Sequence, residues 1–145
     1  MHEAPGADQV AAALHVSTGV LLRRLRQLKA DGELTLPESA ALARLDRGGP
    51  TTAGALARLE QISPQSMGAT FAALEARGLV ARRSDPGDGR RIVLSVTEAG
   101  QRMLRDGRSA RTRRIAAALA DGFTGTELEQ LMTAAPLLER LAHSI

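Results

Sequence analysis

Apolar residues recur along the first part of the chain with the spacing of an amphipathic helix. Between about residues 8 and 30 they lie at intervals of three, four and seven: Val10, Leu14, Leu21, Leu25 and Leu28. Such intervals place them on one face of a helix, and basic residues occupy the other faces. The pattern stops at Asp31-Gly32. The sequence therefore predicts a long first helix with one leucine-rich face.

The segment Thr35-Leu36-Pro37-Glu38 has the composition of a second helix start. A hydroxyl at the N-cap and a carboxylate three residues later form a capping box, and proline suits the first turn. This short helix is predicted to end near Arg47, before Gly48-Gly49-Pro50. A third helix, capped by Thr51 or Thr52, follows up to about residue 60.

The pair Ser63-Pro64 marks a fourth helix, with serine as N-cap and proline as the first helical residue. Apolar residues recur along it at intervals of four and three, and we interpret them as core: Met67, Phe71 and Leu74. The helix is predicted to run to Arg77, where Gly78 supplies the glycine typical of a C-terminus. Two short helices joined by a tight turn are the pattern of a helix-turn-helix.

Residues 79–96 show the alternation of a β-hairpin. The turn-forming segment is Asp85-Pro86-Gly87-Asp88-Gly89, and it follows Leu79-Val80-Ala81-Arg82. After it comes a strand in which apolar residues such as Ile92 and Leu94 alternate. The arginine pairs at 82–83 and 90–91 flank the predicted turn. Guanidinium groups near a hairpin tip suit contact with a polyanion, although they also keep a surface solvated.

The C-terminal third predicts two more helices. Thr97 can cap a long helix from about Glu98 to Ala120, and Thr124 with Glu127 forms another capping box. Pro136 interrupts the leucine pattern of the last helix, so we expect a kink or a break there. The fold class is therefore mainly α with a small two-stranded wing: a winged helix-turn-helix (35–97) between an N-terminal helix (1–34) and C-terminal helices (98–145), one compact domain overall.

Composition narrows the function. At 145 residues the chain suits one domain, and the absence of cysteine excludes disulfides, thiolate zinc sites and thiol redox chemistry. The sequence contains neither an apolar run long enough to span a membrane nor an N-terminal signal pattern, so we expect a cytoplasmic protein. The three histidines are too scattered for a metal site, and no nucleophile–base pair or phosphate loop is visible. We expect no cofactor, no metal and no enzymatic activity.

The charge balance favours a nucleic-acid partner. The net charge is only +3, but Lys29 is the sole lysine and every other strong base is arginine. Arginine suits phosphate recognition, although a G+C-rich genome would produce the same bias. Phe71 and Phe123 are the only aromatic residues. So few aromatics argue against a single-stranded nucleic-acid module, which stacks bases on aromatic rings.

The stretch GLVARRSDPGDGRRIVLSVTEAG (78–100) resembles the wing of MarR-type transcriptional regulators. The matching positions are Asp88, Arg90, Leu94, Val96 and Thr97. The stretch TAGALARLEQISPQSMGATFAALEARGLV (52–80) is similar to the helix-turn-helix of that family. The chain departs from the family where Gly89 and Ala69 stand in positions that often carry basic residues. The resemblance implies a repressor that a small, often anionic or phenolic, molecule detaches from DNA.

We expect double-stranded DNA to meet the N-terminal part of the fourth helix and the wing. Base edges would face Pro64, Gln65, Ser66 and Ala69, and the Gln65 amide can pair bidentately with adenine. Arg90 is expected to enter the minor groove, while Asp88 braces the wing loop. Phosphate contacts are assigned to the remaining arginines and, as a second role, to the caps: Arg77, Arg82, Arg83, Arg91, Thr52 and Ser63.

Reading two half-sites about 34–36 Å apart requires a two-fold dimer. The terminal helices carry leucine stripes that can form a homodimer interface: Leu14, Leu21 and Leu25 with Leu128, Leu131, Leu138 and Leu141. The alternative is that these leucines only complete a monomeric core. An alternative function is a winged-helix protein-interaction module that does not bind DNA sequence-specifically.

Overall fold

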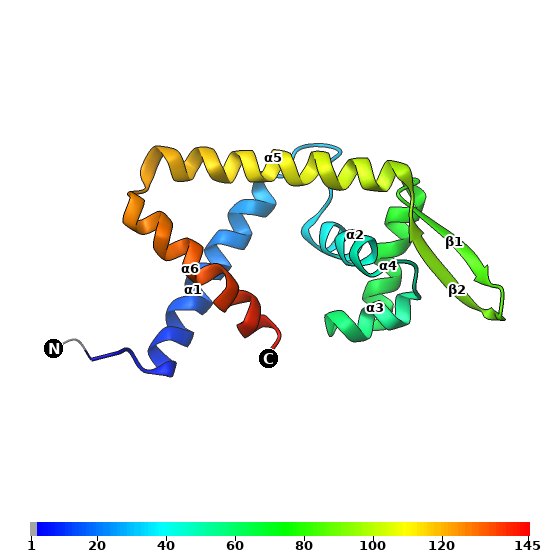
Figure 1. Ribbon diagram of the computed structural model, residues 1–145, viewed down its shortest axis with the longest axis horizontal. Helices are drawn as coiled ribbons and strands as arrows, with labels where there is room; N and C mark the ends of the chain where they lie inside the picture. The colour runs from blue at the N-terminus through cyan, green and yellow to red at the C-terminus, as the bar shows by residue number, and fades with distance from the viewer. Residues whose placement is uncertain (1–2) are drawn as a thin grey trace. The chain divides into compact units, whose positions relative to one another are not determined.

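The computed structural model describes residues 3–145, apart from the side chains of residues 108 and 109. The described chain contains six helices and one hairpin (Figure 1), in the order α1 (Ala7–Gln27), α2 (Leu36–Gly48), α3 (Ala53–Glu60), α4 (Pro64–Ala76), β1 (Val80–Asp85), β2 (Asp88–Val96), α5 (Glu98–Gly122) and α6 (Gly125–Ala142). The predicted fold class is confirmed. The chain divides into two compact units, and the boundary between Leu104 and Arg105 falls inside α5.

Helix ends follow the predicted caps closely. Thr35 and Glu38 form the expected reciprocal capping box of α2, with Thr35 N donating to Glu38 Oε1 at 2.8 Å. Thr52, one of the two residues proposed, caps α3. The first helix is shorter than predicted, because it ends at Gln27 rather than near residue 30. The chain then turns through Gly32, whose φ of 82° lies in the left-handed region that glycine adopts without strain.

The core of the first unit lies between α2, α3, α4 and the hairpin. The predicted core residues of α4 are confirmed, since Met67, Phe71 and Leu74 are all buried. They pack with apolar residues from the other elements, among them Leu42, Leu45, Leu56, Leu79 and Leu94. Arg44 of α2 and Glu60 of α3 form an ion pair at 2.7 Å beside this core. The helix-turn-helix is thus held on one side by α2 and on the other by the wing.

The hairpin has a tighter turn than the sequence predicts. Asp85 pairs with Asp88, so only Pro86 and Gly87 connect the strands, and Gly89 belongs to β2 rather than to the turn. The Asp85 carboxylate explains the tightness, because its Oδ1 accepts a hydrogen bond from Gly87 N at 2.9 Å. The five-residue turn expected from 85–89 is therefore wrong.

A third segment extends the two-stranded wing. Thr51 forms an isolated antiparallel bridge with Leu94, in which Thr51 N donates to Leu94 O at 3.1 Å and Leu94 N to Thr51 O at 2.7 Å. The bridge attaches the connection between α2 and α3 to the base of the wing. The sequence pattern missed it, because a single paired residue produces no alternation.

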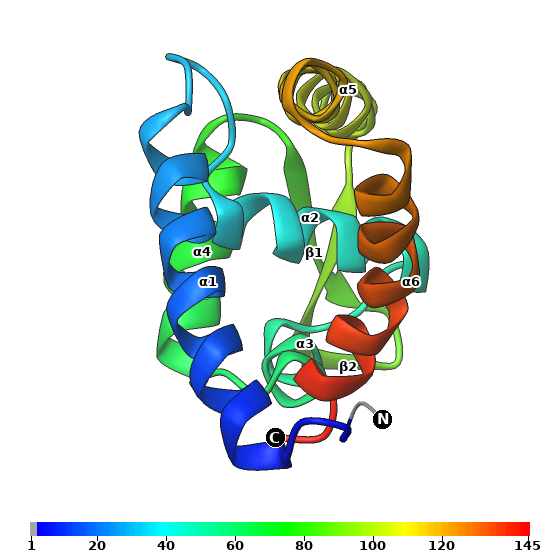
Figure 2. The same cartoon turned by 90° about the vertical axis from the view of Figure 1, so that its left-hand side faces the viewer.

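The second unit contains the remainder of α5 and helix α6. The predicted capping box of α6 is present, with Glu127 N donating to Thr124 Oγ1 at 3.2 Å. The break expected at Pro136 does not occur, and α6 runs through it without interruption (Figure 2). Proline removes the amide that would bond the carbonyl of Met132. Met132 itself lies on the exposed side of the helix, with 77% of its surface accessible.

Candidate nucleic-acid interface

The turn between α3 and α4 is built from local hydrogen bonds. Gln61 adopts a left-handed conformation with φ 54°, and Ile62 N donates to Ala57 O at 3.1 Å, which ends α3. Ser63 then caps α4, because its Oγ accepts from Ser66 N at 3.1 Å. Pro64 is the first helical residue, as predicted. The amino end of α4 is therefore fixed in direction by the residues of the turn itself.

Helix α4 presents its predicted reading residues to solvent. Pro64, Gln65, Ser66 and Ala69 are all exposed, opposite the buried side that faces α2 and α3. The Ser66 hydroxyl accepts a hydrogen bond from Ser63 Oγ at 2.9 Å, so its own proton can be donated outward. The four residues are brought together on one accessible helix end. Their contact with base edges remains a prediction.

The wing tip is braced by two aspartates with different partners. Asp88 Oδ1 accepts from the backbone amide of Arg90 at 3.1 Å, which fits the bracing role predicted for Asp88. The other aspartate, Asp85, forms an ion pair with an arginine side chain: its Oδ2 lies 3.7 Å from Arg91 Nη1. Adjacent residues of a strand point to opposite faces, so Arg90 and Arg91 project from different sides of β2.

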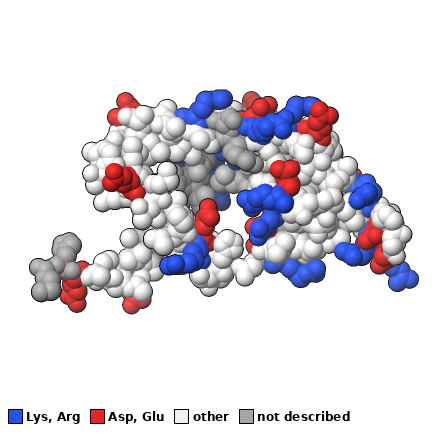
Figure 3. Space-filling view, viewed as in Figure 1, with Lys and Arg blue, Asp and Glu red and all other residues white. Residues whose placement is uncertain are grey.

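The arginines of this region fall into two groups: those whose side chains contact another residue of the chain, and those whose side chains do not. Arg82 forms an ion pair with Glu75 of α4 at 3.0 Å, and Arg77 Nη2 donates to Gly32 O at 2.6 Å. Within the described part of the chain, the guanidinium groups of Arg83 and Arg90 have no hydrogen-bond or ion-pair partner. Figure 3 shows basic and acidic side chains interspersed over the wing. These two guanidinium groups have all of their N–H donors available for phosphate, whereas the ones in contacts have only some of them.

Arg58 on α3 is a candidate that the sequence analysis missed. It is exposed, and no ion pair or hydrogen bond engages its side chain in the described chain. The first helix of a helix-turn-helix crosses the DNA backbone, where a free arginine meets phosphate. The helix periodicity could have predicted this exposure, because Arg58 lies on the side of α3 away from the buried Leu56 and Ala57.

The junction between α4, the wing and α5 is held by one threonine. Thr97 Oγ1 donates to Gly78 O at 2.7 Å and accepts from Gly100 N at 3.1 Å, so it caps α5 as predicted. Thr97 N also donates to Leu79 O at 3.1 Å. A Cβ on Gly100 would overlap the carbonyl oxygen of Leu79. Only glycine therefore allows α5 to start this close to the strand that follows α4.

The leucines assigned to a dimer interface are not buried within the chain. On α1, Leu14 and Leu25 are half-buried and Leu21 is 58% exposed. On α6, all four are exposed: Leu128, Leu131, Leu138 and Leu141. Neither helix contains a buried residue. Their pairing in a homodimer remains a prediction.

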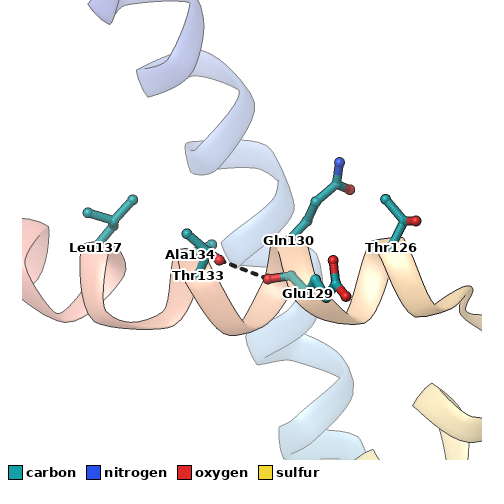
Figure 4. A pocket seen from close by; sticks show the side chains of 6 residues that line it. All are labelled: Thr126, Glu129, Gln130, Thr133, Ala134 and Leu137. Carbon is teal, nitrogen blue, oxygen red and sulfur yellow. Dashed lines mark hydrogen bonds between the residues drawn. The ribbon is translucent and has the colours of Figure 1, made fainter.

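Another face of α6 carries a shallow pocket of about 410 Å³ (Figure 4). Its lining residues all come from this helix: Thr126, Glu129, Gln130, Thr133, Ala134 and Leu137. The Thr133 hydroxyl donates to Glu129 O at 3.0 Å, so it is turned to its own helix. Within residues 3–145, no three acidic or histidine side chains gather as ligands for a metal ion, and no helix is long and apolar enough to cross a bilayer.

Comparison with known proteins agrees with this geometry. Residues 33–91, which contain the helix-turn-helix and most of the wing, match the sequence model of the MarR family. An HTH-type transcriptional regulator of Mycobacterium bovis is 34% identical over 130 residues, which cover 90% of each chain. The chain belongs to the MarR family. It is a transcriptional regulator with a DNA-binding helix-turn-helix, and not an enzyme.

Solved structures of MarR-like regulators share the fold. A transcriptional regulator protein from Pseudomonas aeruginosa is 31% identical and superimposes with a TM-score of 0.73, over 93% of this chain and 95% of that one. MarR from E. coli, solved in complex with operator DNA, has a TM-score of 0.70 over 92% and 93% of the two chains. At 16% identity, that second likeness concerns the fold alone.

Proposed function

We propose that this MarR-family protein is a repressor that binds a palindromic operator as a homodimer and is released by a small-molecule ligand. The observation that carries the DNA-binding part is the accessible amino end of α4 beside a wing with two unpartnered arginines. Arg82 of β1 and Glu75 near the carboxyl end of α4 form an ion pair at 3.0 Å, which joins the two elements. Its place of action would be the cytoplasm, where the operator DNA lies.

The residues of the interface divide into readers and anchors. Pro64, Gln65, Ser66 and Ala69 would lie in the major groove, because the amino end of the second helix faces the base edges. Arg90 would enter the adjacent minor groove, where a narrow groove concentrates negative potential. Phosphates would be held by the other basic side chains and by the caps of the two helices: Arg58, Arg77, Arg82, Arg83, Arg91, Thr52 and Ser63.

The engaged arginines would serve in two ways. A guanidinium group has five N–H donors, and Arg77 uses one of them on Gly32. Arg82 and Arg91 likewise keep donors beyond their ion pairs with Glu75 and Asp85. These three would primarily position α4 and the wing, whereas Arg83 and Arg90 would contribute most to binding.

Dimerisation would bury the leucine stripes of the terminal helices. Exposed leucines in rows are costly in water, at roughly 25 cal/mol for each Å² of apolar surface. Leu21 of α1 and the leucines of α6 are exposed in the single chain, and a second copy would cover them. The regions 1–34 and 98–145 would then hold the two winged helix-turn-helix regions (35–97) at the spacing of successive major grooves.

Release by a ligand rests on membership of the family. A small molecule that binds one conformer of the dimer better than another shifts the population toward it. If that conformer holds the two α4 helices at a spacing that does not match the operator, its affinity for DNA falls.

The experiment is a selection of binding sites from a random duplex library by the purified full chain. The proposal predicts enrichment of inverted repeats whose half-sites lie about 10 base pairs apart, centre to centre. Enrichment of single half-sites alone would contradict the dimeric mode. A library that stays unenriched at low salt would contradict sequence-specific DNA binding and favour a protein-interaction module.

A further inference from the structure

The outward side of α4 carries only one long polar side chain. Residues at intervals of four, three and four lie opposite the buried Met67 and Phe71, and all are exposed: Gln65, Ala69, Ala72 and Ala76. Gln65 alone can form directed hydrogen bonds from this row. Beyond it, the surface consists of methyl groups.

The proposed function, and not the small residues themselves, makes this helix side a DNA surface. Residues 33–91 match the MarR model, and α4 is the second helix of its helix-turn-helix. In the major groove, thymine is the base that offers an apolar group, the C5-methyl, and alanine is one of the side chains that contact it. Guanine is instead read by arginine or lysine, and cytosine by carboxylates. None of these side chains lies on the outward row of α4.

We infer that α4 reads A·T pairs, through the methyl groups of thymine against Ala69 and Ala72 and through adenine at Gln65. The inference rests on the proposed function and specifies which DNA the protein selects. Ala69 stands one turn after Gln65, and Ala72 lies almost one turn further on, so the contacts would follow the groove away from the amino end of the helix. Ala76 lies about 16 Å along the helix axis from Gln65, so it would lie beyond the bases.

Gly68 supports a close approach of α4 to the bases. It lies within α4 beside this row, and a Cβ built on it would meet nothing within 4 Å. The protein itself therefore does not require glycine there, although glycine is among the poorest residues in a helix interior. A glycine and two alanines leave the helix side thin enough for the backbone to enter the groove deeply.

The test compares thymine with deoxyuridine, which lacks only the C5-methyl. The best duplex from the random-library selection is synthesised with deoxyuridine at each thymine in turn, and affinity is measured by fluorescence anisotropy. Removing a methyl that is fully buried against alanine should weaken binding about fourfold, from the transfer free energy of one such group. The loss should appear at one or two positions of each half-site and nowhere else.

Variants connect the effect to the helix. In Ala69→Gly the penalty for deoxyuridine at one position should disappear, whereas Ala76→Gly, the matched control at the last residue of α4, should retain it. Specific binding that is indifferent to deoxyuridine everywhere would overturn this inference and leave the proposed function intact. A protein that selects no duplex at all would overturn both.

Discussion

Arg77 Nη2 donates to the carbonyl oxygen of Gly32 at 2.6 Å, across 45 positions of the chain. The bond joins the C-cap of α4 to the loop between α1 and α2. Helix α4 is thereby linked to the segment that leads from α1 to α2. Arg77 was predicted from the sequence as a phosphate contact, and the structure shows that it also has a partner inside the protein.

Replacing Arg77 by methionine should loosen that loop more than it weakens DNA binding. We expect faster amide exchange around residues 29–34 and a loss of about 1 kcal/mol in the free energy of unfolding, the usual net value of one hydrogen bond. Hydrogen exchange read by mass spectrometry and urea unfolding would measure both. Arg77 would instead be a phosphate contact if amide exchange stayed unchanged and the slope of log affinity against log salt concentration fell by the amount expected for one phosphate.

Arg90→Ala should weaken operator binding by about tenfold to a hundredfold, the range expected for a lost charge-assisted hydrogen bond. Folding should be unaffected, because the side chain has no partner within the described residues. Anisotropy titrations at several salt concentrations would measure the loss. Arg102→Ala, which removes an exposed arginine paired with Glu98, serves as the control. Equal effects of the two substitutions would exclude a specific role for the wing tip.

Gly100→Ala should destabilise the first unit by about 1–3 kcal/mol, the range for an overpacked site. The added methyl would overlap Leu79 O and approach Val96 Cγ1 to 2.8 Å, at the junction held by Thr97. Gly107→Ala is the control in the same helix, where a Cβ meets nothing within 4 Å. It should raise stability by up to about 1 kcal/mol. Urea unfolding of both variants would decide, and a neutral Gly100→Ala would contradict the packing described.

The start of α6 should depend on pH. Hydrogen bonds from the backbone amide of Thr124, and then from its hydroxyl, lower the pKa of Glu127 below its ordinary value. Folding therefore favours the charged carboxylate, and its stabilising contribution is present at neutral pH and is lost as the pH falls through the lowered pKa.

A carboxyl NMR titration would test this. Thr124→Ala should raise the pKa of Glu127 only part of the way, because the backbone amide remains. Thr126→Ala removes a hydroxyl outside the capping box and should leave the titration unchanged. If neither substitution changed the pKa of Glu127, the capping box would not be the cause of the lowered pKa.

Deleting residues 1–30 should abolish the dimer while preserving the winged region. No residue of α1 is buried, so the core around Leu42 and Leu74 stays complete without it. Light scattering would report the mass, and circular dichroism would confirm the remaining helices. A stable dimer after this truncation would show that α1 is not needed for association.

Local chemistry explains what the sequence predicted well. Helix caps and the glycine after α4 act within a few residues, so they can be predicted from the local sequence. The caps at Thr35, Ser63 and Thr124 are examples. The left-handed Gln61 was missed, because glutamine gives no sign of that conformation. Contacts between distant segments, such as Arg82 with Glu75 or Thr51 with Leu94, depend on the assembled fold and leave no periodic trace.

The most direct test of sequence-specific DNA binding is fluorescence anisotropy of the full chain on the DNA upstream of its own gene, against a scrambled duplex, at about 50 and 200 mM salt. A regulator that neutralises several phosphates should prefer its own DNA and lose affinity steeply between the two salt concentrations. Absence of binding to either duplex at the lower salt concentration would contradict DNA binding by this chain, and would favour a winged helix that binds protein rather than DNA.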